Sequence, residues 1–134
     1  MKTRDPEPGQ GVWRGLGWLL LLALFAGQVW VLYVMVPGPG EPFFPGQDKV
    51  GHALLFGVPF GLALLLRSRL AVLGVIGHAM VSEPLQALFT STRVPDPWDL
   101  VANLVGIALA LALVWLVMTS PRVGSLPGAV RDAA

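Results

Sequence analysis

Four long apolar runs, separated by short polar segments, constrain the fold of this chain more than any other feature. The runs cover residues 12–36, 50–66, 70–89 and 99–118. About 20 apolar residues in a helix cross the hydrocarbon core of a bilayer, because each residue adds about 1.5 Å to the helix. We therefore predict an all-α, polytopic membrane protein with four transmembrane helices.

The low charge content favours the same fold class. Only 13% of the residues are charged and 54% are hydrophobic, whereas about 25% are charged in an average soluble domain. A net charge of +1 gives no basic face for a nucleic acid. The chain has no cysteine, which excludes disulfides, thiol chemistry and cysteine-based zinc sites.

The first apolar run has to be distinguished from a secretory signal peptide, since Lys2 and Arg4 precede it. The run 12–36 is longer than the apolar core of a signal peptide and has no small-x-small cleavage site. We interpret it as a retained transmembrane helix. The polar segments 1–11 and 119–134 are expected to be disordered tails.

The distribution of Lys and Arg predicts the orientation. If the four runs alternate in direction, one side carries Lys2, Arg4, Arg14, Arg67, Arg69, Arg122 and Arg131. The other side carries only Lys49 and Arg93. Positively charged loops stay in the cytoplasm, so we predict that both termini are cytoplasmic and that the loops 37–49 and 90–98 face outward.

Polar side chains that are unusual in a membrane lie near the outward ends of the last three helices and in the second outward loop. They are Asp48, Lys49, His52, Glu83, Gln86, Arg93, Asp99 and Asn103. Spacings of three or four residues put members of this set on shared helix faces, as for Asp99 and Asn103. We therefore predict an outward-facing polar pocket in which these residues bind a ligand.

Glu83 is the strongest single indication of function. It lies roughly 9 Å from the end of its predicted helix, counted at 1.5 Å per residue. An unpaired carboxylate costs about 2.5–3.5 kcal/mol at the centre of a membrane helix. Its available partners are Lys49, His52 and Arg93. A structural salt bridge between helices is the alternative role for Glu83.

Other residues have a structural interpretation beside the functional one. Asp48 and Asp99 each stand near a predicted helix start and would serve there as N-caps. We interpret His78, near the middle of its helix, as a neutral histidine bonded to a neighbouring helix. Gly57 and Gly61 have the small-residue spacing that is typical of close helix packing.

Taken together, these residues resemble the pattern of the VanZ-like family of membrane proteins. That pattern has Asp-Lys-x-x-His at one helix start, Glu-x-x-Gln on the next helix, then an Arg, an Asp and an Asn-x-x-Gly. The matching segments are Asp48–His52, Glu83–Gln86, Arg93, Asp99 and Asn103–Gly106. The resemblance implies a multi-pass protein of the bacterial inner (cytoplasmic) membrane, in a family associated with resistance to glycopeptides such as teicoplanin.

Three functions are consistent with these residues. The first is binding or remodelling of an anionic envelope lipid or cell-wall precursor, with Lys49, His52 and Arg93 available to its headgroup. The second is a membrane-embedded hydrolase or transferase for a lipid-linked substrate. Its candidate catalytic residues are His52, Glu83 and Asp99. The third is a structural or accessory protein in which the polar residues only hold the fold.

The sequence does not identify a cofactor. A metal on Asp48, His52, Glu83 and Asp99 is conceivable, but no tight ligand motif such as His-Glu-x-x-His is present. We therefore expect no metal site. The chain has no nucleotide-binding or redox motif, and a homo-oligomer is left open. A transporter would require a dimer to supply two alternating halves.

Overall fold

The computed structural model describes residues 8–35, 42–91 and 96–120. All regular structure in these residues is helical. The elements are α1 (Pro8–Tyr33), α2 (Gln47–Leu65), α3 (Arg69–Phe89) and α4 (Pro97–Thr119). Each helix is long and apolar enough to cross a membrane. This confirms the predicted class, an all-α multi-pass membrane protein with four spanning helices.

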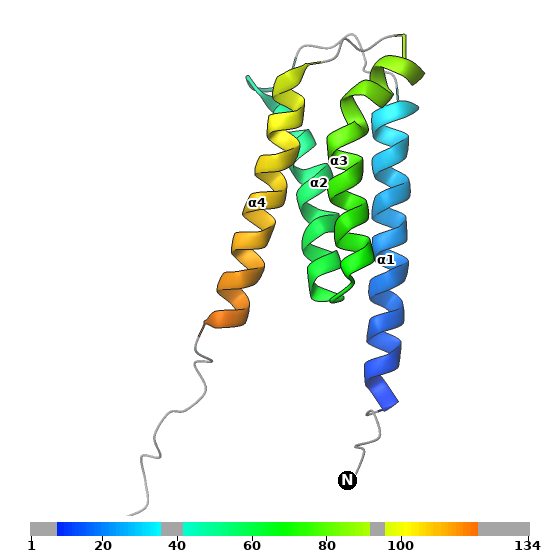
Figure 1. Cartoon of the computed structure of the whole chain (residues 1–134), viewed down its shortest axis with the longest axis vertical. Helices are drawn as coiled ribbons and strands as arrows, with labels where there is room; N and C mark the ends of the chain where they lie inside the picture. Colours follow the sequence, from blue (N-terminus) through cyan, green and yellow to red (C-terminus); the bar gives the residue numbers. More distant parts are fainter. Residues whose placement is uncertain (1–7, 36–41, 92–95, 121–134) are drawn as a thin grey trace, which may run out of the picture.

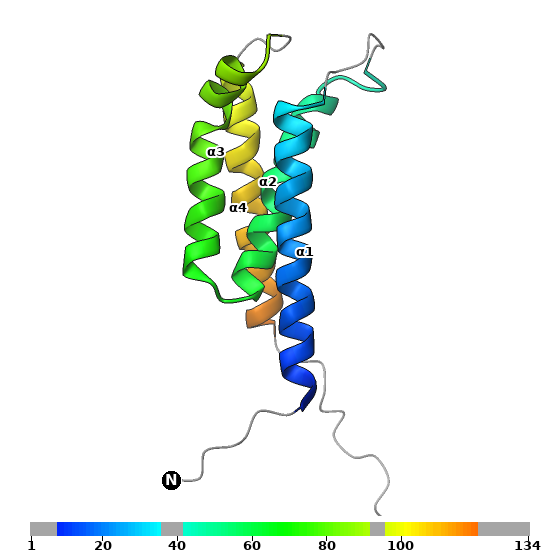
Figure 2. The same ribbon diagram turned by 90° about the vertical axis from the view of Figure 1, so that its right-hand side faces the viewer.

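The helices run side by side and alternate in direction (Figures 1 and 2). The beginning of α1, the α2–α3 turn and the end of α4 all lie at the lower end in both views. α2 contacts all three other helices and packs most extensively against α4. The predicted cytoplasmic position of this lower end remains a prediction.

The helix ends differ from the predicted runs by a few residues. α1 begins at Pro8, inside the segment that we expected to be a disordered tail, and it ends at Tyr33 rather than at residue 36. The predicted tails at 1–7 and 121–134 lie outside the described residues and stay predictions.

Both predicted N-caps are wrong. The N-cap of α4 is Asp96, whose side chain accepts a hydrogen bond from the backbone N–H of Trp98. The N-cap of α2 is Gly46, which has a left-handed backbone with φ 81°. The two helices begin before the apolar runs do, so Asp48 and Asp99 already lie in the first turns. A carboxylate in a first turn interacts favourably with the helix dipole.

Glycine allows the backbones of α2 and α4 to approach closely. A Cβ atom on Gly57 would lie 2.7 Å from the carbonyl oxygen of Gly106. A Cβ atom on Gly106 would collide with the carbonyl oxygen of Ala53. The predicted role of Gly57 in packing is therefore confirmed, while Gly61 has only an ordinary contact distance of 3.7 Å to Ala110. This crossing brings the first turns of α2 and α4 together.

Two prolines lie inside helices without ending them. Pro59 belongs to α2 and Pro84 to α3. A proline has no N–H, so Pro84 leaves the carbonyl of Met80 without its helical donor. α3 bends in its upper part in both views, in the third of the helix that contains Pro84 (Figures 1 and 2).

Candidate functional site

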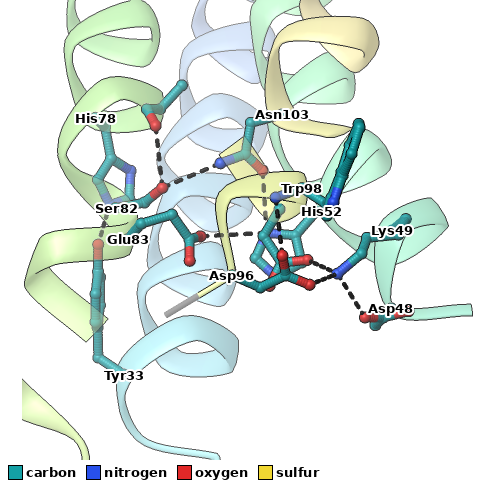
Figure 3. Close-up of polar contacts among 12 residues, drawn as sticks. Tyr33, Asp48, Lys49, His52, His78, Ser82, Glu83, Asp96, Trp98 and Asn103 are labelled. Atoms are coloured by element: carbon teal, nitrogen blue, oxygen red, sulfur yellow. Dashed lines mark hydrogen bonds and ion pairs between the residues drawn. The ribbon is translucent and has the colours of Figure 1, made fainter. Parts of the chain in front are cut away.

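Polar side chains from three helices meet where α2 begins, α3 ends and α4 begins (Figure 3). We call this region the polar end. The side chains are Lys49 and His52 of α2, Ser82 and Glu83 of α3, and Asp99 and Asn103 of α4. His52, Glu83 and Asn103 expose only 4%, 7% and 0% of their surface. The predicted convergence of these helix ends is thus present in the structure.

Lys49 is surrounded by three carboxylates, which together with it form the lysine group. Its Nζ lies 2.5 Å from Asp96, 2.5 Å from Asp99 and 3.0 Å from Asp48. The ammonium of a lysine has three donors and no acceptor. The three carboxylates therefore occupy the whole donor capacity of Lys49. Its hydrogen bond also lowers the pKa of Asp96 below the ordinary 3.8.

His52, Glu83 and Asp99 form a second cluster, the histidine group. The Nε2 atom of His52 lies 3.4 Å from Oδ2 of Asp99, and its Nδ1 lies 4.0 Å from Oε1 of Glu83. Asp99 belongs to both groups, since its Oδ1 atom contacts Lys49. The histidine group is the more buried of the two.

A chain of hydrogen bonds fixes which nitrogen of His52 carries a proton. The Ser82 hydroxyl donates to the carbonyl of Ala79, and Nδ2 of Asn103 donates to Ser82 at 3.0 Å. The remaining amide atom, Oδ1 of Asn103, can only accept, and it lies 3.0 Å from Nδ1 of His52. Nδ1 is therefore the protonated nitrogen. In the neutral ring, Nε2 then has its lone pair directed to the side of Asp99.

The histidine group contains buried acceptor atoms that no described donor satisfies. Neither carboxylate oxygen of Glu83 has a hydrogen-bond partner among the described residues, although both are buried. The Nε2 atom of His52 lies 3.4 Å from the carboxylate of Asp99, so a neutral ring would direct its lone pair at another acceptor. Buried polar atoms are nearly always satisfied by a partner, a water or an ion. This arrangement favours a positively charged ligand.

The charge balance of the polar end points the same way. The described part of the polar end has four carboxylates and one ammonium, which leave a net charge of −3 when all of them are ionised and His52 is neutral. The charged side chains involved are Asp48, Lys49, Glu83, Asp96 and Asp99.

Two sets of three side chains are close enough to share a cation. One is His52, Glu83 and Asp99, whose ligand atoms all lie within 4.8 Å of one another; the second is Asp48, Asp96 and Asp99. The ammonium of Lys49 already occupies the second set. The first set is the histidine group, and it includes no cationic side chain.

An apolar groove runs along α2 and α4, beginning beside the polar end. It has a volume of about 470 Å³ and is lined only by apolar side chains and glycines of α1, α2 and α4. Ala53, which follows His52 directly, and Gly106, three residues after Asn103, belong to its lining. The shape and polarity of the groove suit a hydrocarbon chain.

Not every predicted site residue joins these groups. Asp48 joins only the lysine group, through its contact with Lys49, and exposes 64% of its side chain. Gln86 is buried, but no bond links it to either group, and its Nε2 has no partner among the described residues. Arg93 lies outside the described residues.

Two residues join the polar end although the sequence did not assign them to the site. Asp96 binds Lys49 and also caps α4. An aspartate immediately before a helix-starting proline is a typical N-cap pattern, which could have pointed to this residue. Ser82 positions Asn103. A lone serine in an apolar helix gives no comparable signal.

His78 stands apart from both groups. Its Nε2 lies 2.8 Å from the hydroxyl of Tyr33 on α1, so the predicted bond to a neighbouring helix is present. Its ring packs among the rings of Phe25, Tyr33 and Phe56. We assign it to the core that joins α1 to α3.

Comparison with known proteins found no match among family models, curated proteins or solved structures. The function therefore has to be argued from the residues and the geometry of the polar end.

Proposed function

We propose that this chain is a VanZ-like protein of the bacterial cell envelope that binds an anionic, lipid-linked envelope component at its polar end. The observation that carries the proposal is the buried polar cluster at a membrane-facing groove. Ionisable groups inside a membrane are costly and are retained for function. Here they lie beside an apolar groove of about 470 Å³ that can accept a lipid chain.

The groove supports a ligand with both a polar head and a hydrocarbon tail. Its lining includes Ala53, Gly57 and Gly106, which lie close to His52 and Asn103 in sequence. A lipid lying in the groove would bring its headgroup next to the histidine group. Neither a soluble metabolite nor a peptide would use the apolar half of this arrangement.

The geometry corrects one part of the sequence hypothesis. We expected Lys49 and His52 to be available to an anionic headgroup. All three donors of Lys49 face carboxylates, however, and Nδ1–H of His52 is donated to Asn103. Among the described residues of the polar end, an anionic head therefore finds no free cationic side chain. A bound cation or a group outside the described residues has to supply the attraction.

The proposed location is the bacterial inner membrane with the polar end outward. Support comes from two exposed arginines at the opposite end, Arg67 in the α2–α3 turn and Arg69 at the start of α3. Positively charged turns favour the cytoplasmic side. An association of this chain with glycopeptide resistance belongs to the same proposal and rests on the resemblance to the VanZ-like family.

Native mass spectrometry in mild detergent tests the proposal. The protein is incubated with a synthetic polyprenyl phosphate or with the matching polyprenol. We expect one polyprenyl phosphate per chain and much weaker retention of the uncharged alcohol. Absence of bound lipid, or equal retention of phosphate and alcohol, would contradict a site for an anionic lipid.

Two glycine variants localise the lipid. Gly61→Leu places a side chain in the groove, because Gly61 belongs to its lining. Gly74→Leu on α3 is the matched control, since Gly74 has open space around it and does not line the groove. We expect Gly61→Leu to lose the lipid and Gly74→Leu to keep it.

A membrane-embedded hydrolase or transferase is the second candidate. One observation favours it: the two ring nitrogens of His52 lie beside the buried carboxylate of Glu83 and the half-buried carboxylate of Asp99. Such a group can take a proton from a water or hydroxyl that attacks a phosphate. Incubation with a polyprenyl pyrophosphate, followed by ³¹P NMR, tests for catalysis. Release of phosphate by the wild type, lost in His52→Gln, would move the assignment from binding to enzyme.

A further inference from the structure

We propose that His52, Glu83 and Asp99 bind one divalent metal ion of the zinc or manganese type. The ligand atoms of the three side chains lie within 4.8 Å of one another. They come from three different helices, and each is held at the polar end by packing or hydrogen bonds. Asp99 also contacts Lys49, but Glu83 forms no ion pair with a lysine or arginine among the described residues.

Glu83 is a buried carboxylate without a hydrogen-bond partner among the described residues. It exposes only 7% of its surface, and the absence of a described partner holds for both of its carboxylate oxygens. An isolated buried carboxylate is among the most costly groups in a protein. His52 lies 4.0 Å away, through a nitrogen whose hydrogen already points to Asn103, and the backbone N–H of Asp96 also faces this carboxylate. A metal ion at this position would remove the cost.

His52 is oriented by a hydrogen bond of the kind that metal-binding histidines make. Histidines that bind metals nearly always donate the other ring N–H to an oxygen, which fixes the tautomer and the ring plane. Here Nδ1–H donates to Asn103, and Asn103 is held in turn by Ser82. The other ring nitrogen, Nε2, lies 3.4 Å from Oδ2 of Asp99. When the ring is neutral, its Nε2 lone pair and this carboxylate oxygen are both acceptors, and together with Glu83 they have the spacing of ligands to one shared ion.

The lysine group differs from the histidine group in having an ammonium among its carboxylates. The carboxylates of Asp48, Asp96 and Asp99 could also hold a metal ion by their spacing. The chain fills that position with its own ammonium, from Lys49. No described side chain does the same for the histidine group. Among the described residues, the ammonium of Lys49 thus neutralises the more exposed acidic position, while the more buried Glu83 forms no ion pair with a lysine or arginine.

The donor set selects the type of metal. Carboxylate and water ligands suit Mg²⁺ and Ca²⁺, whereas imidazole favours Zn²⁺ and other transition metals. One imidazole with two carboxylates is compatible with Zn²⁺ or Mn²⁺. Three protein ligands leave at least one coordination position open, as in catalytic rather than structural zinc sites.

A metal ion at this site would also explain how an anionic lipid binds at the polar end. This role in lipid binding rests on the proposed function, whereas the metal site itself does not. The polar end is acidic, and Lys49 has no donor left for a phosphate. A divalent ion would supply the positive charge and the open coordination position that a lipid-linked phosphate needs.

Isothermal titration calorimetry of the metal-stripped, detergent-purified protein with ZnCl₂ or MnCl₂ alone tests the site. We expect one ion per chain. Glu83→Gln and His52→Gln should each weaken binding by at least about tenfold, the lower limit for losing even an outer partner of a metal ligand. His78→Gln is the matched control, because His78 is the other histidine of the chain and bonds to Tyr33 instead.

Lack of binding to the wild type would overturn the proposal, as would equal binding by Glu83→Gln. If a variant does not fold, X-ray absorption at the zinc edge of the loaded wild type decides. One imidazole among oxygen ligands is expected, and a shell without imidazole would contradict the site. The titration uses no lipid, and the lipid test uses variants outside the histidine group, so each can fail without the other.

Discussion

The lysine group and the histidine group are neighbours that share Asp99, yet their charges are balanced in opposite ways. In the lysine group, three carboxylates surround one ammonium at 2.5–3.0 Å. In the histidine group, His52 lies 4.0 Å from Glu83 and 3.4 Å from Asp99, and neither oxygen of Glu83 has a hydrogen-bond partner among the described residues. The comparison teaches that acidic side chains alone do not make a cation site. What matters is whether the chain supplies its own cation.

Exposure sharpens the contrast. The side chains of Lys49 and Asp96 are 31% and 39% exposed, while those of His52 and Glu83 are 6% and 10% exposed. Water screens an unbalanced charge in the lysine group, but much less in the histidine group. Binding of an added cation is therefore expected to be most favourable at the histidine group.

The largest effect is expected when the two groups lose their common scaffold. Gly106→Val would push its side chain into the carbonyl of Ala53 and separate α2 from α4. We expect a loss of about 3 kcal/mol, the upper end for overpacking, because a backbone cannot move aside as a side chain can. Thermal unfolding in detergent measures it, with Gly61→Ala as a control that has room beside Ala110. An unchanged melting temperature for Gly106→Val would refute the close crossing.

The next largest effect concerns the histidine group alone. Asn103→Leu removes the acceptor for Nδ1–H of His52 and leaves Ser82 without its donor. We expect metal affinity to fall about 10–100-fold, as for other partners of metal-binding histidines. Asn103→Asp keeps an acceptor oxygen and should retain most of the affinity. Equal affinities for wild type and Asn103→Leu would show that the ring needs no such support.

A smaller effect is expected when the lysine group loses its ammonium. Lys49→Met leaves Asp48, Asp96 and Asp99 as a second set of acceptors with metal-ligand spacing. The variant should lose roughly 1–2 kcal/mol of stability, between the values for exposed and buried ion pairs. It should also bind a second ion per chain in a titration with MnCl₂. A variant that still binds only one ion would break the comparison between the groups.

The smallest effect is a pH dependence at the exposed edge of the lysine group. The hydrogen bond from Lys49 lowers the pKa of Asp96 below its ordinary value of 3.8. A carboxyl whose pKa is lower in the folded state stabilises that state above its unfolded pKa, and the contribution disappears as the pH falls through the lowered value.

Acidification from about pH 6 to about pH 3, across the ordinary range of an aspartate, should therefore reduce the melting temperature more in the wild type than in Asp96→Asn. Because Asp96 is solvent-exposed, the difference should be small, and it should shrink further at high salt. A steeper pH dependence in Asp96→Asn would have the wrong sign for an aspartate held ionised by Lys49.

Much of the fold could be predicted from the sequence, because hydropathy over about 20 residues decides whether a helix spans a membrane. The convergence of Lys49, His52, Glu83 and Asp99 could also be predicted, since ionisable residues in apolar runs must lie near one another or near water. The starts of the helices were harder to predict from the sequence. α4 begins at its Asp96 cap, before the apolar run that hydropathy detects.

The partners of individual side chains could not be predicted. Whether Lys49 faces a ligand or three carboxylates depends on how closely α2 and α4 cross, and Gly57 and Gly106 set that distance. The sequence named His52, Glu83 and Asp99 among conceivable metal ligands but argued against a metal, because no local ligand motif is present. The three residues of the proposed metal site lie on three helices, so such a motif could not occur.

Native mass spectrometry of the wild type with a polyprenyl phosphate, before and after removal of metal, tests the central claim most directly. We expect one divalent ion and one lipid per chain before chelation, and loss of both after it. Readdition of Zn²⁺ or Mn²⁺ should restore the lipid in the wild type but not in Glu83→Gln. Lipid retained equally by the metal-free wild type and by Glu83→Gln would contradict a metal-dependent lipid site at the polar end.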